Sequence, residues 1–165
     1  MCNRDDREPP NQGVRAGSLP ASRLTLAGSG SERSSMDEQL RHYSDKLAYE
    51  TDSWDLKVAL EAGENVIAVD ARSPEAYRKE HIPGAVNIPH RTMSRETTKH
   101  LDRDALVVTY CDGIGCNAST KGALNMAKLG FRVKELIGGL DWWKRDGHKT
   151  EGGSAATKEG TCGCK

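Results

Sequence analysis

The sequence predicts an α/β protein in three layers, with a central, mostly parallel sheet and helices on both faces. Two short apolar runs rich in β-branched residues, Val66–Asp70 and Leu106–Tyr110, have the length of buried strands. Longer segments with helical periodicity alternate with such runs along the chain. This alternation is typical of a parallel sheet that is covered on both faces.

The expected elements follow one another from residue 37 to Trp143. A stripe of Leu40, Tyr43 and Leu47 predicts an amphipathic helix over 37–49. The first half of the domain continues with a helix from Ser53 to near Gly63, capped by Ser53 or Asp52, a strand over 66–70, and a short helix opened by Ser73-Pro74-Glu75. A turn over 81–85, a strand over 85–88 and a helix over 94–101 follow. The second half consists of a strand over 106–110, a helix over 118–129 with Asn117 or Ser119 as its N-cap, a strand over 133–137, and a last helix after Gly138-Gly139 that holds Trp142 and Trp143.

Composition divides the 165 residues into three parts. Residues 1–35 contain no Lys and no aromatic residue, so we expect a disordered N-terminal extension. Residues 36–149 contain the periodic segments and form the expected domain. Residues 150–165 are rich in Gly, Ser and Thr, which predicts a flexible tail that ends in Cys162-Gly163-Cys164. A helix opening follows Met36 directly, which raises the hypothesis that translation starts there.

Charge and cysteine content exclude several classes of protein. Lys plus Arg number 24, as do Asp plus Glu, so no overall field attracts nucleic acid or an anionic membrane. The chain has no apolar run of membrane-spanning length and no apolar secretory segment at its N-terminus. Five cysteines are an odd number and form no recognisable disulfide framework. We therefore expect a cytoplasmic protein with reduced thiols and without nucleic-acid or membrane partners.

The stretch over 106–119 predicts the functional site. A buried strand leads into a loop that contains Cys111 and Cys116, and a helix follows. In α/β sheets, ligands bind at this edge, where loop N–H groups and a helix N-terminus attract anions and favour a thiolate. Cys111 is therefore the predicted nucleophile, and the alternative is a small buried residue that ends a strand. The predicted anion-binding loop consists of Asp112, Gly113, Ile114, Gly115, Cys116 and Asn117.

Several segments resemble the single-domain rhodanese family, in order, from about Ser53 to His148. They are Val69-Asp70-Ala71-Arg72-Ser73-Pro74-Glu75, His81-Ile82-Pro83-Gly84-Ala85-Val86-Asn87-Ile88-Pro89, the strand into Cys111, and Gly138-Gly139 with Trp142. The resemblance implies a rhodanese-like sulfurtransferase in which Cys111 takes a sulfane sulfur as a persulfide and passes it to a thiophilic acceptor. It implies small donors such as thiosulfate, a persulfide or a polysulfide, thiol or cyanide acceptors, and no metal or organic cofactor.

The loop departs from the family in its charge. Active rhodaneses often carry Arg or Lys in this loop, whereas residues 112–116 supply no cation, so a persulfide or polysulfide competes with thiosulfate as the donor. Asp112 is also expected to raise the pKa of the neighbouring thiol. Asp70, Arg72 and His81 are predicted to support the site: the first two as an ion pair between loops, and His81 as a hydrogen-bonding residue in a turn. A catalytic role for Asp70 and Arg72 is the alternative.

Cys116 is a candidate resolving cysteine. Its thiolate would attack the inner sulfur of a Cys111 persulfide, release hydrosulfide and leave a disulfide that a cellular reductant reopens. The alternative is that Cys116 fills space beneath the loop.

Other functions compete with sulfur transfer. A cysteine phosphatase or arsenate reductase needs a guanidinium six residues after its cysteine, and position 117 is Asn. A zinc site would need Cys111 and Cys116 to join Cys162 and Cys164 at irregular spacing. A non-enzymatic or redox-sensing rhodanese-like module is the last alternative, and the presence of Cys111 argues against it.

Overall fold

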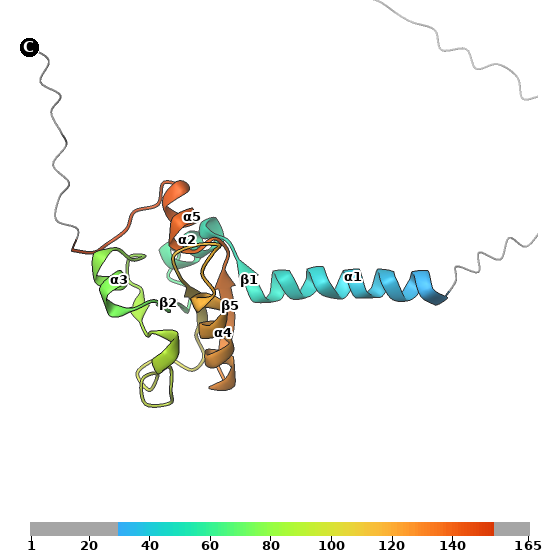
Figure 1. Ribbon diagram of the computed structural model, residues 1–165, viewed down its shortest axis with the longest axis horizontal. Coiled ribbons are helices and arrows are strands. Elements are labelled where there is room, and N and C mark those ends of the chain that lie inside the picture. Colours follow the sequence, from blue (N-terminus) through green and yellow to red (C-terminus); the bar gives the residue numbers. More distant parts are fainter. Residues whose placement is uncertain (1–29, 154–165) are drawn as a thin grey trace, which may run out of the picture.

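The computed structural model describes residues 30–153 (Figure 1). Its centre is a five-stranded sheet in the order β1-β5-β4-β2-β3, and every neighbouring pair of strands is parallel. The predicted fold class, an α/β fold with a largely parallel sheet, is confirmed. The strands are β1 (Glu50–Thr51), β2 (Val66–Asp70), β3 (Val86–Asn87), β4 (Leu106–Tyr110) and β5 (Arg132–Leu136).

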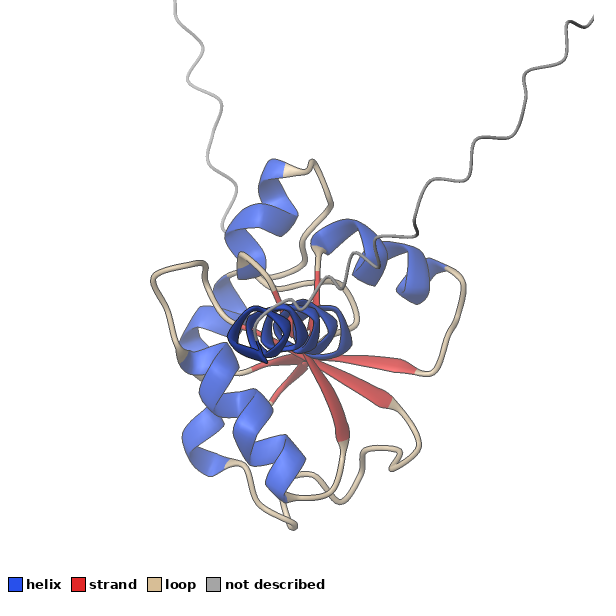
Figure 2. Cartoon of the chain, turned by 90° about the vertical axis from the view of Figure 1, so that its right-hand side faces the viewer, coloured by secondary structure: helices blue, strands red, loops and turns tan. Residues whose placement is uncertain are grey.

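Helices surround the sheet in the described part of the chain (Figure 2). They are α1 (Gly30–Tyr49), α2 (Ser53–Glu61), α3 (Pro74–Lys79), the short 3-10 helix η1 (His90–Thr92), α4 (Ala118–Lys128) and α5 (Gly139–Arg145). Polar side chains begin two of them as the sequence predicted. The Asp52 carboxylate accepts a hydrogen bond from the N–H of Asp55 at the start of α2, and the Ser73 hydroxyl accepts one from the N–H of Ala76 at the start of α3.

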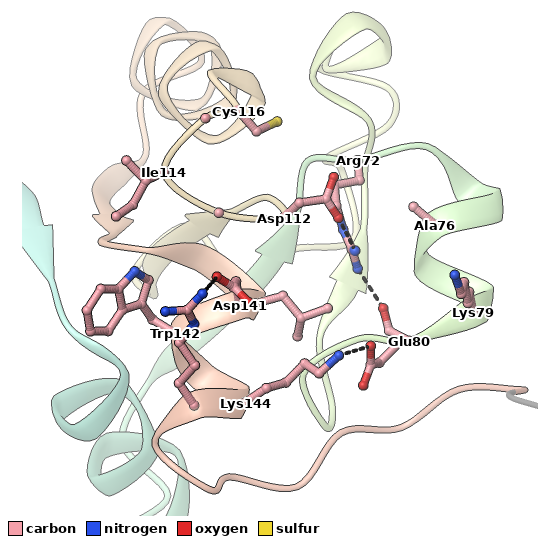
Figure 3. A pocket seen from close by; sticks show the side chains of 14 residues that line it. Arg72, Ala76, Lys79, Glu80, Asp112, Ile114, Cys116, Asp141, Trp142 and Lys144 are labelled. Carbon is pink, nitrogen blue, oxygen red and sulfur yellow. Dashed lines mark hydrogen bonds and ion pairs between the residues drawn. The ribbon is translucent and has the colours of Figure 1, made fainter. Parts of the chain in front are cut away.

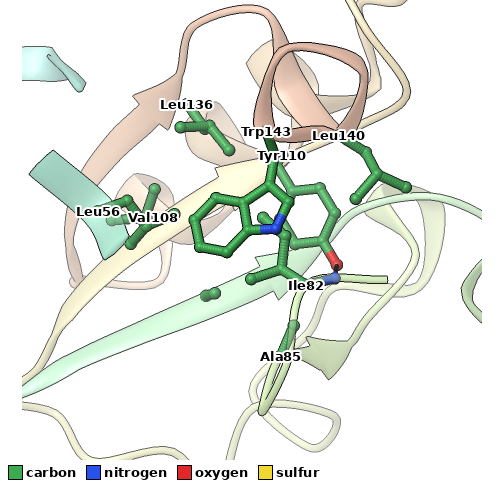
Figure 4. Close-up of a cluster of buried hydrophobic side chains, with 9 residues drawn as sticks. Leu56, Ile82, Ala85, Val108, Tyr110, Leu136, Leu140 and Trp143 are labelled. Carbon is green, nitrogen blue, oxygen red and sulfur yellow. Dashed lines mark hydrogen bonds between the residues drawn. The ribbon is translucent and has the colours of Figure 1, made fainter. Parts of the chain in front are cut away.

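The sheet separates two hydrophobic cores because successive side chains of a strand point to opposite faces. Val108 of β4 packs with Leu56 of α2 and Trp143 of α5 (Figure 4). Its neighbour Val107 packs on the other face with Met126 of α4. Burial on both faces explains why β4 is an unbroken apolar run in the sequence.

Two expected elements differ in the structure. Residues 94–101 form bends and turns rather than a helix. The Thr97 hydroxyl accepts the N–H of Ser94 at 2.9 Å, and the Thr98 hydroxyl donates to the carbonyl of Ser94 at 2.8 Å. Such short polar side chains compete with the backbone bonds of a helix. Strand β1 was not predicted, because it is two residues long and has no apolar pattern.

Helix α1 begins six residues before Met36, so residues 30–35 are helical and not part of a disordered extension. The helix projects away from the domain (Figure 1). Its apolar stripe does not pack on the sheet, because Leu40, Tyr43 and Leu47 are 62–78% exposed. The rest of the expected extension, with Cys2, and most of the expected tail, with Cys162 and Cys164, lie outside the described residues.

The domain extends past its expected end at residue 149. The backbones of His81 and Glu151 pair in both directions, with N–H to carbonyl distances of 2.7 and 2.9 Å. The Thr150 hydroxyl donates to the carboxylate of Glu80 at 2.9 Å. Residues 150–153, the start of the expected flexible tail, are therefore held against the domain by backbone pairing that composition does not indicate.

Candidate active site

Cys111 follows β4 directly, at the carboxyl edge of the sheet and between β5 and β2. Its side chain is only 1% exposed and packs with Ala71 and Ala118. The Sγ atom lies 3.2 Å from the Ser119 hydroxyl and 3.1 Å from the carbonyl oxygen of Cys116. The sulfur thus sits at the base of the loop, beside the first turn of α4.

The loop curls back towards Cys111 before α4 begins. The N–H of Cys116 donates to the carbonyl of Gly113 at 3.0 Å, which closes a turn. Among residues 30–153, no acceptor binds the N–H groups of Gly113, Ile114 and Gly115, so they are available to a bound anion. Asn117 occupies the N-cap position of α4 without a side-chain bond. Of the two predicted N-caps, Asn117 is the one at the N-cap position, and Ser119 lies inside the helix.

Helix α5 fixes the start of the loop. The N–H groups of Leu140 and Asp141 donate to the carbonyls of Cys111 and Asp112 at 2.9 and 2.8 Å. This approach requires a glycine at position 139, where φ is +56° and a Cβ would lie 2.4 Å from the Cys111 carbonyl oxygen. The Gly-Gly pair quoted from the sequence therefore has a structural role beneath the loop.

Arg72 connects the loop to the neighbouring strand. Its guanidinium lies 2.6 Å from the carboxylate of Asp70 and 2.7 Å from that of Asp112, and it donates to the carbonyl of Glu80. Burial would lower the pKa of Arg72, but hydrogen bonds and attraction from the two aspartates raise it overall. Arg72 thus stays charged and holds Asp112 at the rim of the loop.

The thiol of Cys111 ionises less readily than the sequence suggested. Burial raises its pKa, hydrogen bonds from Ser119 lower it in part, and the neighbouring Cys116 raises it further. The direction is opposite to the expected easy ionisation, because the effect of burial outweighs that of the hydrogen bonds from Ser119. Asp112 is not the cause, since its carboxylate is directed to Arg72.

Two pockets adjoin the loop. One of about 770 Å³ is lined by Arg72, Asp112 and Trp142, among others (Figure 3). The other, of about 350 Å³, is lined by Cys111 and Glu135. Residues 113–116 line both pockets, so the loop forms the wall between them. Cys111 lines the smaller pocket and not the larger one.

Glu135 lines this pocket although no sequence pattern predicted it there. Its carboxylate accepts hydrogen bonds from the hydroxyls of Ser119 and Thr120 at 2.7 and 2.9 Å. Glu135 lies on β5, opposite Thr109 of β4 in the sheet register. No motif links position 135 with position 111, because their proximity depends on the pairing of two strands that are distant in sequence.

His81 lies in the segment between α3 and β3 and lines neither pocket. Its Nδ1 atom is 2.7 Å from the carbonyl oxygen of Tyr77, and its ring stacks on the Tyr77 ring with centroids 3.8 Å apart. These contacts hold the connection between α3 and β3.

The competing zinc site would need Cys162 and Cys164, which lie outside the described residues. Residues 30–153 contain no cluster of three or more His, Cys, Asp or Glu side chains that could hold a metal ion. The guanidinium of Arg72 is engaged by Asp70, Asp112 and Glu80, so it does not supply the free clamp that a phosphatase loop requires. No helix in this range is both long and apolar enough to cross a membrane.

The chain belongs to the rhodanese-like family, because the family model "Rhodanese-like domain" matches residues 54–146. It is 35% identical over 94 residues to the HTH-type transcriptional regulator Rv0324 of Mycobacterium tuberculosis, covering 57% of this chain and 41% of that protein. It is 34% identical over 73 residues to the thiosulfate sulfurtransferase PspE of Escherichia coli, covering 44% of this chain and 68% of PspE. The crystal structure of BH2092 from Bacillus halodurans is 47% identical, with a TM-score of 0.68, covering 71% of this chain and 86% of that one.

Proposed function

We propose that the protein is a sulfurtransferase that moves a sulfane sulfur from a small donor to a thiophilic acceptor through a Cys111 persulfide. The observation that carries this proposal is the position of the Cys111 sulfur, at the end of β4 and beside a loop with free N–H groups and the N-terminus of α4. The name of the PspE relative supports the same activity.

The first step loads sulfur onto Cys111. Its thiolate attacks the sulfane sulfur of the donor, a new S–S bond forms, and sulfite leaves when thiosulfate is the donor or a thiolate when a persulfide is the donor. An acceptor thiolate or cyanide then attacks the outer sulfur, and the Cys111 thiolate leaves. The loop N–H groups would stabilise the charge of the donor and of the persulfide.

The charges at the loop favour a persulfide or polysulfide donor. The loop has no cation of its own, and Arg72 is engaged by two aspartates. A doubly charged thiosulfate in the pocket of Cys111 would instead meet the carboxylates of Glu50 and Glu135, and Lys46, the cation that lines this pocket, is paired with Glu50. We place the reaction in the cytoplasm, where Cys111 would remain reduced.

We also propose that Cys116 resolves the persulfide. Its side chain packs against the cluster of Ala71, Cys111 and Ala118, and both thiols are free. Attack of the Cys116 thiolate on the inner sulfur of the persulfide forms a Cys111–Cys116 disulfide. The outer sulfur leaves as hydrosulfide and takes the electron pair, so no external oxidant is needed. A low-molecular-weight thiol or a dithiol reductant then reopens the bridge.

The test is direct sulfur loading of the reduced protein. Thiosulfate, 3-mercaptopyruvate and glutathione persulfide are supplied separately, and intact-mass and peptide analysis locate the added sulfur. We expect one sulfur atom to stay on Cys111 in Cys116→Ser, which has no resolving thiol, and we expect the fastest loading from glutathione persulfide. Cys111→Ser should lose loading with every donor, whereas Cys116→Ser should retain it. Sulfur transfer that persists in Cys111→Ser would overturn the assignment.

A further inference from the structure

Ser119 and Glu135 form a hydrogen-bonded chain that begins at the sulfur of Cys111. The Ser119 hydroxyl lies 3.2 Å from Sγ and donates to Oε1 of Glu135 at 2.7 Å. Ser119 is 3% exposed, and the Thr109 hydroxyl donates to its carbonyl at 3.1 Å, so its position is fixed. The sulfur-transfer steps described above make no use of Glu135.

A hydroxyl has one proton, so Ser119 can donate to only one partner at a time. While that proton is on the Glu135 side, the oxygen of Ser119 can only accept a hydrogen bond from Cys111, which requires the thiol form. The backbone N–H of Ser119 favours the thiolate and lowers the pKa of Cys111. The other close neighbours of the sulfur are the carbonyl oxygens of Cys116 at 3.1 Å and Gly113 at 3.7 Å. These oxygens accept from a thiol and repel a thiolate.

We propose that Glu135 controls the ionisation of Cys111 through Ser119. With Glu135 charged and holding the hydroxyl, Cys111 stays a thiol. When the thiol loses its proton to solvent in the pocket, the hydroxyl turns to the sulfur, and Glu135 keeps its bond from Thr120. Glu135 is thus a positioning residue that acts through Ser119. The inference rests on the proposed function only in taking the Cys111 thiolate as the nucleophile.

The surrounding charges have partners of their own. Glu50 of β1 lies opposite Glu135 in the sheet register, and Lys46 of α1 forms an ion pair with Glu50. The charged residues that line the pocket of Cys111 are Lys46, Glu50 and Glu135. Asp112 with Arg72 and Asp141 with Arg145 line the larger pocket, across the loop. Of these carboxylates, only Glu135 has a hydrogen-bonded path to the sulfur among residues 30–153.

The test measures how fast iodoacetamide alkylates Cys111 across a pH series, with peptide mass analysis to distinguish the five cysteines. In Glu135→Gln the amide can donate to Ser119 and free its hydroxyl for the thiolate. We expect alkylation near neutral pH to rise about threefold, because the thiolate fraction rises about tenfold while each thiolate is about threefold less nucleophilic. Ser119→Ala should shift the profile to higher pH and slow alkylation by a similar factor.

The double variant separates a hydrogen-bonded chain from a general electrostatic field. If Glu135 acts through Ser119, then Glu135→Gln added to Ser119→Ala should produce little further change. The proposal would be overturned if Glu135→Gln shifts the pH profile of alkylation equally in the wild type and in Ser119→Ala. It would also be overturned if Glu135→Gln leaves the profile unchanged. Alkylation needs no sulfur donor, so this result is independent of sulfur loading. If the variants shift the alkylation profile but no donor loads sulfur onto Cys111, the proposed function is contradicted and the control of Cys111 by Glu135 still holds.

Discussion

Gly139 permits the contact that fixes the base of the loop. Its φ is +56°, which residues with a side chain rarely adopt, and a Cβ at this position would lie 2.4 Å from the Cys111 carbonyl oxygen. We expect Gly139→Ala to lower the free energy of unfolding by about 2 kcal/mol, because strain and overlap add. Urea unfolding monitored by tryptophan fluorescence measures this loss.

Gly130→Ala is the matched control for that substitution. Gly130 has φ of +91°, but no atom lies within 4 Å of the added Cβ. Only the backbone strain remains, so we expect a loss of about 1 kcal/mol. Equal losses in Gly139→Ala and Gly130→Ala would contradict the close contact between α5 and the loop.

The raised pKa of the Cys111 thiol predicts how its reactivity depends on pH. Because burial disfavours the thiolate, the thiol form dominates at neutral pH, and the thiolate fraction grows as the pH rises towards the pKa. We expect the alkylation rate of wild-type Cys111 to increase about tenfold per pH unit in this range. A rate that is already constant from about pH 7 upwards would show a thiolate in the resting site and contradict this prediction.

At the scale of single residues, the sequence located Cys111 but not its electrostatic surroundings. A strand, two glycines and a helix start are local signals, so the place of the cysteine could be predicted. Burial, the contact with Ser119 and the bond from Ser119 to Glu135 depend on the packing of α4 and β5, which no local pattern specifies. For the same reason the ion pair of Arg72 with Asp112, forty residues apart, was not predicted.

At the scale of elements, the loop between β4 and α4 carries the next prediction. If Cys116 resolves the persulfide, one round of loading without an external thiol should release hydrosulfide and leave a Cys111–Cys116 disulfide. Peptide mapping without reduction detects the bridge, and a sulfide assay detects the product. Cys116→Ser should keep its persulfide and release little sulfide.

Mild peroxide gives an independent test of the same pair. Cys111 should form the Cys111–Cys116 bridge in the wild type, whereas Cys116→Ser should accumulate sulfinic acid on Cys111. If sulfinic acid forms at the same rate in both proteins, the resolving role is wrong and Cys116 only fills space beneath the loop.

Helix α1 shows the limit of periodicity as a signal. The stripe of Leu40, Tyr43 and Leu47 predicted a helix, and the helix is present. The stripe does not lie on the sheet, because only the end of α1 reaches the domain, where Lys134 binds the carbonyl of Leu47 at 2.9 Å. An apolar stripe thus indicates a helix but not the surface against which it packs.

At the scale of the whole molecule, alternation of strands and helices was enough to predict the fold class. Runs such as Val66–Asp70 are apolar on both faces, which is the property of a covered parallel sheet. Strand β1 and the end of the domain escaped prediction. Both rest on backbone hydrogen bonds between polar residues, and such bonds leave no trace in composition.

The end of the domain leads to a prediction about shortened chains. A chain of residues 36–153 keeps the pairing between His81 and Glu151 and the bond from the Gly153 N–H to the Arg78 carbonyl at 2.8 Å. A chain of residues 36–149 loses both. Each bond contributes about 1 kcal/mol, and ordering the segment offsets most of the sum. We therefore expect a net loss of about 1 kcal/mol, which lowers the unfolding temperature by about 4 °C.

Glu151→Ala in the chain of residues 36–153 is the control for this comparison. It removes the carboxylate that lies 3.8 Å from the His81 ring but keeps the backbone pairing. Because this carboxylate is exposed, its loss should change the unfolding temperature by less than about 1 °C. Thermal unfolding followed by circular dichroism compares the three proteins. If the chains ending at 149 and 153 unfold at the same temperature, residues 150–153 add no stability, and the domain ends where composition alone had placed its boundary.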